Sequence, residues 1–186
     1  MTGKYEDKYR IQSARLQNWD YGWNGSYFIT ICTKGRESHL GNIADENMCL
    51  SQAGKLVYQL WYEIPDHFLF VLLDAFVVMP NHIHGIIVID KTDGDDDDGR
   101  DAINRVSTTT GGATGDKNPM MHKNLSRIIR WYKGRVAFEL QKIIPEFGWQ
   151  PRFHDHIIRN QKSFESIQAY IINNPVKWHE DTYYEK

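Results

Sequence analysis

The chain has 186 residues, a length typical of one domain. Its hydrophobic fraction of 41% and charged fraction of 25% are those of a globular protein, and they exclude a wholly disordered or fibrous chain. The net charge of −2 gives by itself no indication of a nucleic-acid partner.

Apolar patterns predict seven main elements in chain order. They are a strand at Ser26–Thr33, a helix at Ser51–Glu63, strands at Phe68–Met79 and His82–Asp90, a helix at Leu125–Ile143, a strand at Gln150–Arg159, and a helix at Phe164–Asn173 capped by Ser163. A small hairpin is also expected within Glu37–Leu50. This order is the split βαβ pattern with one extra helix, so we expect an α+β, ferredoxin-like domain: an antiparallel sheet, helices on one face and a C-terminal helix.

The connection before the Leu125–Ile143 helix has an unusual composition. Lys91–Pro119 has almost no large apolar residue, which predicts a mobile loop inside one domain spanning 1–186. Its acidic part, Lys91–Asp101, has six Asp against one Lys and one Arg, a net charge of −4. Lys123–Lys142 has six basic residues and one Glu, a net charge of +5. The separation of the two signs indicates an anionic partner more clearly than the total charge does.

The sequence also indicates where the protein acts in the cell. No stretch approaches the roughly 18 uncharged apolar residues of a membrane span, and the polar N-terminus lacks the apolar segment of a signal peptide. The two cysteines have no motif spacing, so neither a disulfide scaffold nor a zinc ribbon is indicated. We therefore expect a cytoplasmic protein with no membrane partner.

Two histidines begin the fourth predicted strand. His82 and His84 are two residues apart, so their side chains lie on one face of the strand, about 7 Å apart along it. Two imidazoles at this spacing are able to hold one divalent metal if another element supplies a third ligand. The alternative is a pair of hydrogen-bonded polar residues. A second pair, His154 and His156, is expected to be structural, with His156 a reserve candidate for metal or phosphate contact.

The last predicted helix carries a tyrosine and an asparagine one turn apart. Tyr170 and Asn174 share a helix face at positions i and i+4. Taken singly, Tyr170 is typical of packing, and Asn174 before Pro175 is typical of a helix stop. With the histidines they form a chemical set, because a phenol attacks phosphate more readily when a metal polarises that phosphate.

These motifs resemble a known family. Pro80-Asn-His-Ile-His84 before an apolar strand is similar to the HUH motif, in which a large apolar residue separates two histidines. Trp149-Gln-Pro-Arg-Phe153, Asp155-His156, Ile158-Arg-Asn160 and Tyr170-Ile-x-x-Asn-Pro175 resemble the C-terminal half of REP-associated tyrosine transposases, relatives of the small single-tyrosine HUH transposases of bacterial insertion sequences. The resemblance covers Ser26 to Lys177 apart from the Lys91–Pro119 loop.

The resemblance implies a complete site. It implies a ferredoxin-like nuclease domain that uses Mg²⁺ or Mn²⁺ to cut single-stranded DNA at hairpin-associated sites and forms a 5′-phosphotyrosine. His82 and His84 match the metal ligands and Tyr170 matches the nucleophile. Asn174 stands where relatives often place a glutamine as the third ligand. The resemblance also implies a homodimer.

Basic residues are candidates for contact with DNA. Arg127, Arg130 and Lys133 lie mainly off the apolar stripe of their helix, and Lys123 precedes it. Together with Arg152 they are predicted to neutralise phosphates. The alternative is a helix face that is only exposed to solvent, which would have the same sequence pattern. Trp131 is able to stack on an unpaired base, whereas Tyr132 lies on the apolar stripe.

The leading hypothesis is a metal-dependent enzyme that nicks and rejoins single-stranded DNA. The alternative is a non-catalytic protein that recognises hairpin or single-stranded DNA. An RNA-binding domain is a third interpretation, but no strand has the aromatic signature of an RNA-recognition motif.

Overall fold

The structure of the chain is a computed structural model, which describes residues 4–5, 8–9, 21–92 and 124–184. Apart from its first two residues, the loop predicted to be mobile at 91–119 lies outside the described residues.

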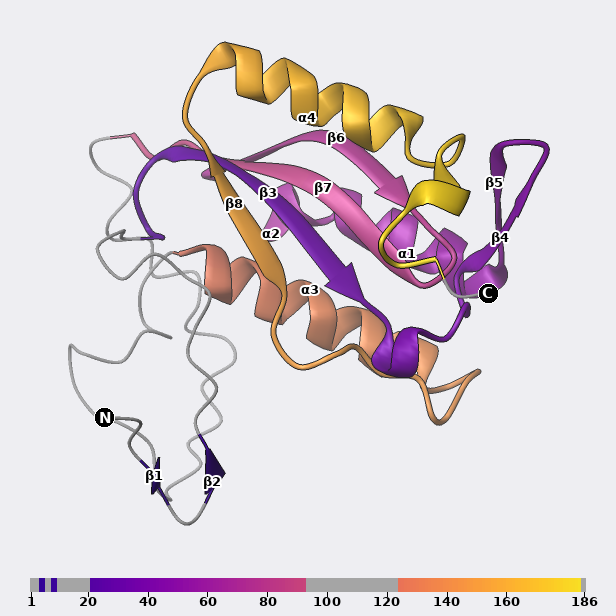
Figure 1. Ribbon diagram of the computed structural model, residues 1–186. Coiled ribbons are helices and arrows are strands. Elements are labelled where there is room, and N and C mark those ends of the chain that lie inside the picture. The colour runs from indigo at the N-terminus through magenta and orange to yellow at the C-terminus, as the bar shows by residue number, and fades with distance from the viewer. Residues whose placement is uncertain (1–3, 6–7, 10–20, 93–123, 185–186) are drawn as a thin grey trace.

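A four-stranded antiparallel sheet forms the centre of the described domain (Figure 1). Its strands lie in the order β6-β7-β3-β8. They are β3 (Gly25–Cys32), β6 (Val71–Val78), β7 (His82–Ile89) and β8 (His154–Ile158). Helix α1 (Gln52–Tyr62) follows β3 and helix α3 (Leu125–Leu140) follows β7, which is the predicted split βαβ order. Helix α4 (Gln161–Asn173) is the predicted extra helix.

Short elements complete the described chain. Two small hairpins are present, and the second was expected from the sequence: β1 (Lys4–Tyr5) with β2 (Lys8–Tyr9), and β4 (Gly41–Ala44) with β5 (Asn47–Leu50). The remaining elements are single turns: η1 (Lys34–Arg36), α2 (Ile64–His67) and η3 (Trp178–Glu180).

The strand predicted from Phe68 was too long at its N-terminal end. The turn α2 occupies the preceding residues, and β6 begins only at Val71. Pro65 lies in the first turn of α2, where the N–H that proline lacks would have no helical partner.

The C-terminal elements differ from the sequence prediction in three places. Helix α3 ends at Leu140 rather than Ile143, and β8 covers only His154–Ile158 of the expected Gln150–Arg159. Helix α4 begins at Gln161, because the Oδ1 of Asn160 accepts a hydrogen bond from the Ser163 N–H at 2.9 Å. The predicted cap at Ser163 was therefore wrong: Asn160 is the N-cap.

The two faces of the sheet are covered by different helices. In Figure 1, α1 and α3 lie on one face and α4 lies on the other. Residues of β7 alternate between them: Ile83 and Ile87 belong to the main hydrophobic core with α1 and α3, whereas Ile86 packs with Ile171 of α4.

The main core lies between the sheet, α1 and α3. It is rich in aromatic rings: Trp61 stacks on Phe76 with centroids 4.4 Å apart and meets Tyr132 edge-on at 5.2 Å. The buried Tyr132 hydroxyl donates a hydrogen bond to the Val57 carbonyl at 3.0 Å. The prediction that Tyr132 belongs to the core is therefore confirmed.

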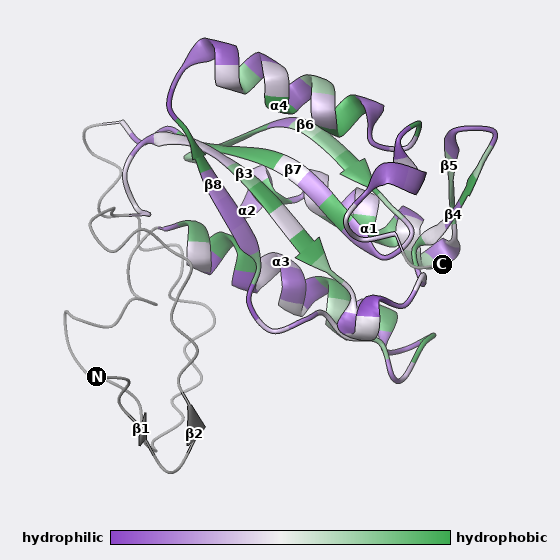
Figure 2. Ribbon diagram, viewed as in Figure 1, coloured by the Kyte–Doolittle hydropathy of each residue, from purple (hydrophilic) through white to green (hydrophobic). Residues whose placement is uncertain are grey.

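The face under α4 has a much smaller apolar cluster. Its buried members are Ile86, Ile158 and Ile171. Figure 2 shows that β8 is hydrophilic over most of its length, in contrast to the apolar central strands. Part of this face is therefore left for polar side chains. Among the helices of the described residues, none is long and apolar enough to cross a membrane.

Candidate functional site

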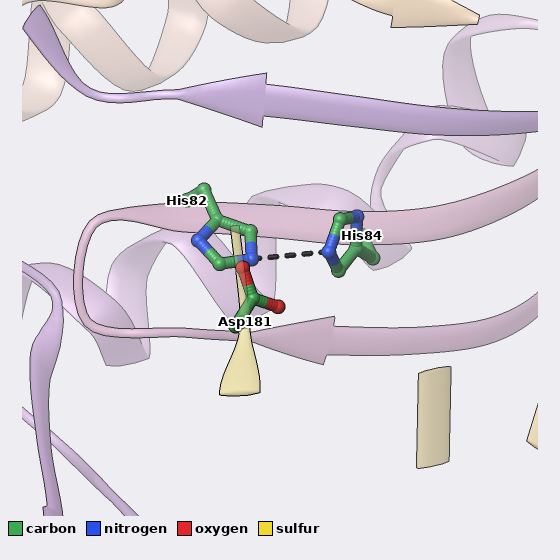
Figure 3. A group of neighbouring side chains, drawn as sticks. All are labelled: His82, His84 and Asp181. Atoms are coloured by element: carbon green, nitrogen blue, oxygen red, sulfur yellow. Dashed lines mark hydrogen bonds between the residues drawn. The ribbon is translucent and has the colours of Figure 1, made fainter. Parts of the chain in front are cut away.

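The two histidines of β7 lie together at the start of the strand. As strand parity predicted, their side chains share one face, and their Nε2 atoms are 3.0 Å apart (Figure 3). His82 is 0% and His84 is 1% exposed to solvent. Two nitrogens that each lie about 2.1 Å from one metal at a right angle would be about 3 Å apart, so the observed spacing fits a shared cation.

Neighbouring polar groups orient both rings. The Nδ1–H of His82 donates to the Oδ1 of Asn81 at 2.9 Å, and the Nδ2 of Asn81 donates to the Tyr183 carbonyl at 2.8 Å. This chain of bonds makes the Nε2 of His82 the acceptor nitrogen of its ring, with its lone pair directed at the Nε2 of His84. The Nδ1 of His84 lies 2.8 Å from the Thr30 hydroxyl, on the strand paired with β7. Such outer hydrogen bonds are typical of metal-binding histidines.

Burial keeps the pair neutral. It lowers the pKa of His82 to about 3, with a further contribution from the positive charge of Arg36. Burial also lowers the pKa of His84 to about 3, helped by the neighbouring His82, while Asp181 acts in the opposite direction. Neutral imidazoles are the form that binds metals.

Asp181, which no sequence pattern predicted as a site residue, lies beside the histidine pair. Atoms of His82, His84 and Asp181 that are able to bind a metal all lie within 4.8 Å of one another, so this group could hold an ion (Figure 3). Asp181 follows η3, in the C-terminal segment that crosses the pair. No motif in the sequence marks this return of the chain, and the family resemblance ended at Lys177.

The C-terminal segment also covers the pair with aromatic rings. The Tyr183 ring lies 4.6 Å from the His82 ring, and the Trp178 ring lies 5.9 Å from it, measured between centroids. The Arg36 guanidinium lies over the Tyr183 ring at 5.4 Å. These contacts explain why both histidines are excluded from solvent.

Asn174, predicted as the third ligand, has an unusual environment. It is 2% exposed, and its Nδ2 donates to the Asp181 carboxylate at 3.0 Å. Its Oδ1 is buried without a hydrogen-bond partner among the residues that the structure describes. A buried acceptor left unpaired is costly, and a cation beside it would remove that cost. The available donors, imidazole nitrogens and amide or carboxylate oxygens, could hold a divalent cation.

Tyr170 of α4 points at the pair from the side facing solvent. Its hydroxyl lies 3.3 Å from the Nε2 of His84, within the same chain, and the residue is 44% exposed. Phe28 supports both rings, since it stacks on His84 at 5.2 Å and meets Tyr170 edge-on at 6.0 Å. Burial, followed by the charge of Asp181, raises the pKa of Tyr170 to about 12, while Asn174 lowers it. A nearby cation would be needed to favour the phenolate.

The predicted DNA-binding residues lie elsewhere. Arg127 and Arg130 are on α3, across the sheet from the histidines, and Lys123 lies outside the described residues. Lys133 donates to the carbonyls of Gln150 and Arg152, at 2.8 and 2.6 Å, and so ties α3 to the segment before β8. Burial lowers the pKa of Lys133 to about 8.

The second histidine pair lies on β8 and is exposed. His154 and His156 pair with Thr30 and Phe28, so they share the face of His84. Neither belongs to the group of metal-binding atoms around His82 and His84. Their roles stay predictions.

Comparison with known proteins places the chain in a family. No family model matches it. It is 36% identical, over 187 residues, to an uncharacterized protein of Haemophilus influenzae, and the match covers 99% of each chain. The two proteins belong to one family. Because the match runs over nearly the whole of both chains, it includes the His82–His84 strand and the Tyr170 helix.

A solved structure has the same fold. It is that of a REP-associated tyrosine transposase bound to a REP hairpin. The TM-score is 0.56 at 22% sequence identity, and the match covers 90% of this chain and 74% of that one. The mixed architecture of antiparallel sheet and helices predicted from the sequence is therefore confirmed.

Proposed function

We propose that this protein is a metal-dependent enzyme that nicks and rejoins single-stranded DNA through a tyrosine, in the manner of a transposase. One observation carries the proposal. In a single chain, the Tyr170 hydroxyl lies 3.3 Å from the Nε2 of His84, which itself lies 3.0 Å from the Nε2 of His82. This spacing supports the assignment of Tyr170 as the nucleophile and of the two histidines as metal ligands, because one phosphate could meet all three side chains.

The residues have defined roles in this reaction. The Tyr170 hydroxyl gives its proton to solvent, and its oxygen forms a bond to phosphorus as the bond from phosphorus to the 3′-oxygen breaks. The 3′-oxygen takes up a proton, which leaves a 3′-OH and a 5′-phosphate joined to Tyr170. Attack by a 3′-OH on this phosphotyrosine reverses the step and rejoins a strand.

Three side chains are assigned as the metal site: His82, His84 and Asn174. Asp181 offers a second oxygen donor beside them. A bound Mg²⁺ or Mn²⁺ would neutralise charge on the phosphate and favour the phenolate of Tyr170. The segment containing Trp178 and Tyr183 covers the pair, so this segment has to move before DNA reaches it.

DNA is the proposed partner. The transposase of similar fold was solved bound to a REP hairpin, and we assign a hairpin-forming strand as the substrate here. Arg127, Arg130 and Arg152 are proposed to contact phosphates, and the same role is proposed for Lys123. Lys133 is proposed to act by holding the Arg152 segment as well as by its charge. Because Tyr170 meets the histidines of its own chain, the chemistry does not require the homodimer that the family resemblance implies.

The test is a search for the covalent intermediate. The full chain is incubated with Mn²⁺ and a pool of single-stranded hairpin DNAs, and protein–DNA adducts are scored on a denaturing gel. We expect an adduct that depends on Mn²⁺ and disappears in Tyr170→Phe. An adduct that persists in this variant contradicts the assignment, and Tyr183 and Tyr184 would then be tested.

A non-catalytic DNA-binding protein is the second candidate. It is favoured by the burial of both histidines beneath the C-terminal segment. It predicts binding to hairpin DNA with no adduct at any Mn²⁺ concentration, which separates the two candidates in the same experiment.

A further inference from the structure

Arg36 lies in a tight turn beside the histidine pair. It is the last residue of η1, the turn that follows β3. The last residue of β3, Cys32, pairs with His82, so the turn lies at the His82 end of the pair. The hydroxyl of Tyr170, in contrast, lies 3.3 Å from the Nε2 of His84. Arg36 and the proposed nucleophile therefore approach the pair from different ends.

The backbone of Arg36 is held in an unusual conformation. Its φ of 58° lies in the left-handed region, which is uncommon for a residue other than glycine. Thr33 fixes the turn, because its N–H donates to the Asn81 carbonyl at 2.9 Å and its hydroxyl donates to the Glu37 carbonyl at 2.8 Å. Asn81 in turn orients the His82 ring. Strained residues that their surroundings hold in place are typical of functional sites, so the position of Arg36 beside His82 is a candidate functional feature.

The Arg36 guanidinium makes no ion pair or side-chain hydrogen bond to any residue that the structure describes. Two carboxylates of this region have partners of their own. Glu37, on the same side of the turn in sequence, lies 2.8 Å from the His39 ring nitrogen. Asp181 accepts a hydrogen bond from the Tyr183 N–H at 2.7 Å. A guanidinium has five N–H donors, and those of Arg36 are therefore able to bind an anion.

The Tyr183 ring covers the guanidinium and links it to the pair. The Arg36 guanidinium lies over this ring at 5.4 Å, and the ring centre lies 4.6 Å from that of His82. The positive charge is thus within about 10 Å of the His82 ring, a separation at which charges interact at moderate ionic strength. Tyr183 belongs to the segment that has to move before DNA reaches the histidines, and its movement would uncover Arg36 beside the pair.

The geometry of phosphoryl transfer relates Arg36 to one side of the cut. In an in-line displacement the attacking and leaving oxygens lie on opposite sides of phosphorus. Because Tyr170 approaches beside His84, the leaving 3′-oxygen would lie toward His82. Arg36 lies at that end of the pair. A planar guanidinium is suited to this position, because two of its N–H groups are able to bind one phosphate together.

We propose that Arg36 binds the DNA segment that ends in the leaving 3′-oxygen, at the phosphate next to the cut. The proposal rests on the proposed function, since it takes the histidine pair as the place of cutting. It adds a positive charge at the pair itself, whereas the other proposed DNA contacts lie on α3 and before β8. Arg36 exchanges the Tyr183 ring for a phosphate and, after cutting, retains the 3′-OH segment for rejoining.

Arg36→Gln and Lys34→Gln form a matched pair of variants. Each removes one positive charge from η1, but among the described residues only Arg36 lies over the Tyr183 ring. Binding of a labelled hairpin DNA with single-stranded oligo(dT) flanks is measured by fluorescence anisotropy in Mn²⁺ at several salt concentrations. Arg36→Gln should weaken binding about tenfold and reduce the slope of log affinity against log salt by about 0.7, the value for one phosphate contact on a single strand. Lys34→Gln should leave both quantities nearly unchanged.

A purely structural role for Arg36 predicts a different result. Loss of the guanidinium removes a contact of the Tyr183 ring, which should loosen the covering segment and leave DNA binding unchanged or tighter. Unchanged or tighter binding by Arg36→Gln therefore overturns the proposal, as does an equal loss in Lys34→Gln.

Arg36→Lys is the second variant, and it decides if circular dichroism shows that Arg36→Gln does not fold. It keeps the charge but not the planar pair of donors, so it should weaken binding at an unchanged salt slope. Binding by Arg36→Lys as tight as that of the wild type overturns the proposal.

Adduct formation at Tyr170, measured in parallel, tests the side of the cut and separates this proposal from the proposed function. With label on the segment that ends in the 3′-OH, Arg36→Gln should release more of this segment and rejoin less of it than the wild type. Equal release overturns the assignment to the 3′ side. If the wild type forms the adduct and Arg36→Gln keeps its affinity, the Arg36 assignment fails and the nicking function stands. If no adduct forms but Arg36→Gln weakens binding at a lower slope, the nicking function fails and Arg36 remains a DNA-binding residue.

Discussion

The two faces of the sheet use the same strand for different purposes. On the face under α1 and α3, Ile83 and Ile87 are fully buried in a core of aliphatic and aromatic side chains. On the face under α4, His82 and His84 are buried as deeply, but each also has hydrogen-bonding groups beside the aromatic rings that cover it. Burial alone therefore does not distinguish a stabilising residue from a candidate site residue.

The two faces contribute to different free energies, those of folding and of cation binding. Apolar side chains buried on the α1/α3 face contribute to the stability of the fold. Neutral imidazoles on the α4 face are costly to bury, but they are the form of histidine that could bind a cation. Substitutions on neighbouring residues of β7 should thus separate stability from activity. The predictions below follow this comparison, and the substitutions among them run from the largest expected change in the free energy of unfolding to the smallest.

Ile87→Ala tests the α1/α3 face. Ile87 is 0% exposed, so the substitution leaves a cavity and should lower the free energy of unfolding by roughly 2–5 kcal/mol. Urea denaturation followed by circular dichroism measures the change. Val88→Ala is the matched control on the α4 face, where Val88 is only partly buried, and it should cost less. An equal cost for the two would remove the distinction between the faces.

Acidification tests the neutral histidines. Their folded pKa values are about 3 against an ordinary value of 6.5, so the folded state binds fewer protons than the unfolded state between these limits. Their contribution to stability is present above pH 6.5 and is lost as the pH falls from 6.5 toward 3.

The expected loss in metal-free protein is at most about 3 kcal/mol for each pH unit, since two groups titrate. Denaturation in EDTA across this range measures it. His84→Gln should reduce the slope by about half. A slope that is the same in wild type and His84→Gln would show that the pair is not the cause.

His84→Ala tests the α4 face directly. It should abolish Mn²⁺ binding, measured by calorimetry, together with the covalent adduct. The free energy of unfolding should fall by only about 1–2 kcal/mol, because the lost contacts are hydrogen bonds and one stacked ring. His156→Ala, exposed on the same face, should keep both activities. A loss of stability as large as that of Ile87→Ala would show that His84 is a packing residue.

Tyr170→Phe should change the stability least of these substitutions and should abolish formation of the covalent adduct. The variant loses one hydroxyl from a half-exposed ring, so the free energy of unfolding should change by less than about 0.5 kcal/mol. The adduct should disappear while hairpin affinity is retained. Tyr183→Phe should still form the adduct, which tests whether the nucleophile is Tyr170 or the other tyrosine near the pair.

Much of this arrangement follows from local rules. Strand parity was enough to place His82 and His84 on one face, and helical spacing was enough to place Tyr170 and Asn174 on another. The order of strands and helices along the chain was enough to predict an antiparallel sheet. Helix starts were less certain, because Asn160 and Ser163 are both good N-caps, and only the observed hydrogen bond decides between them.

The rest depends on contacts distant in sequence. Asp181 reaches the histidines only because the chain turns back after α4, and no periodic pattern records that return. Lys133 follows the pattern of an exposed cation on a basic helix, yet its ammonium is occupied by two backbone carbonyls. The spacing of residues in the sequence predicts the face on which a side chain lies, but not the groups that it contacts on that face.

The hydroxyl of Thr30 has a consequence for how a cation would enter. Asn81 accepts from His82 and fixes its tautomer, but a hydroxyl both donates and accepts, so Thr30 is compatible with either tautomer of His84. Without metal, the Nε2–H of His84 is free to donate to His82. With metal, the proton would reside on Nδ1 and point at the Thr30 oxygen. The exchange needs only a relocated proton and one rotated O–H bond, so no heavy atom of the pair has to move and the net charge of the two rings stays the same.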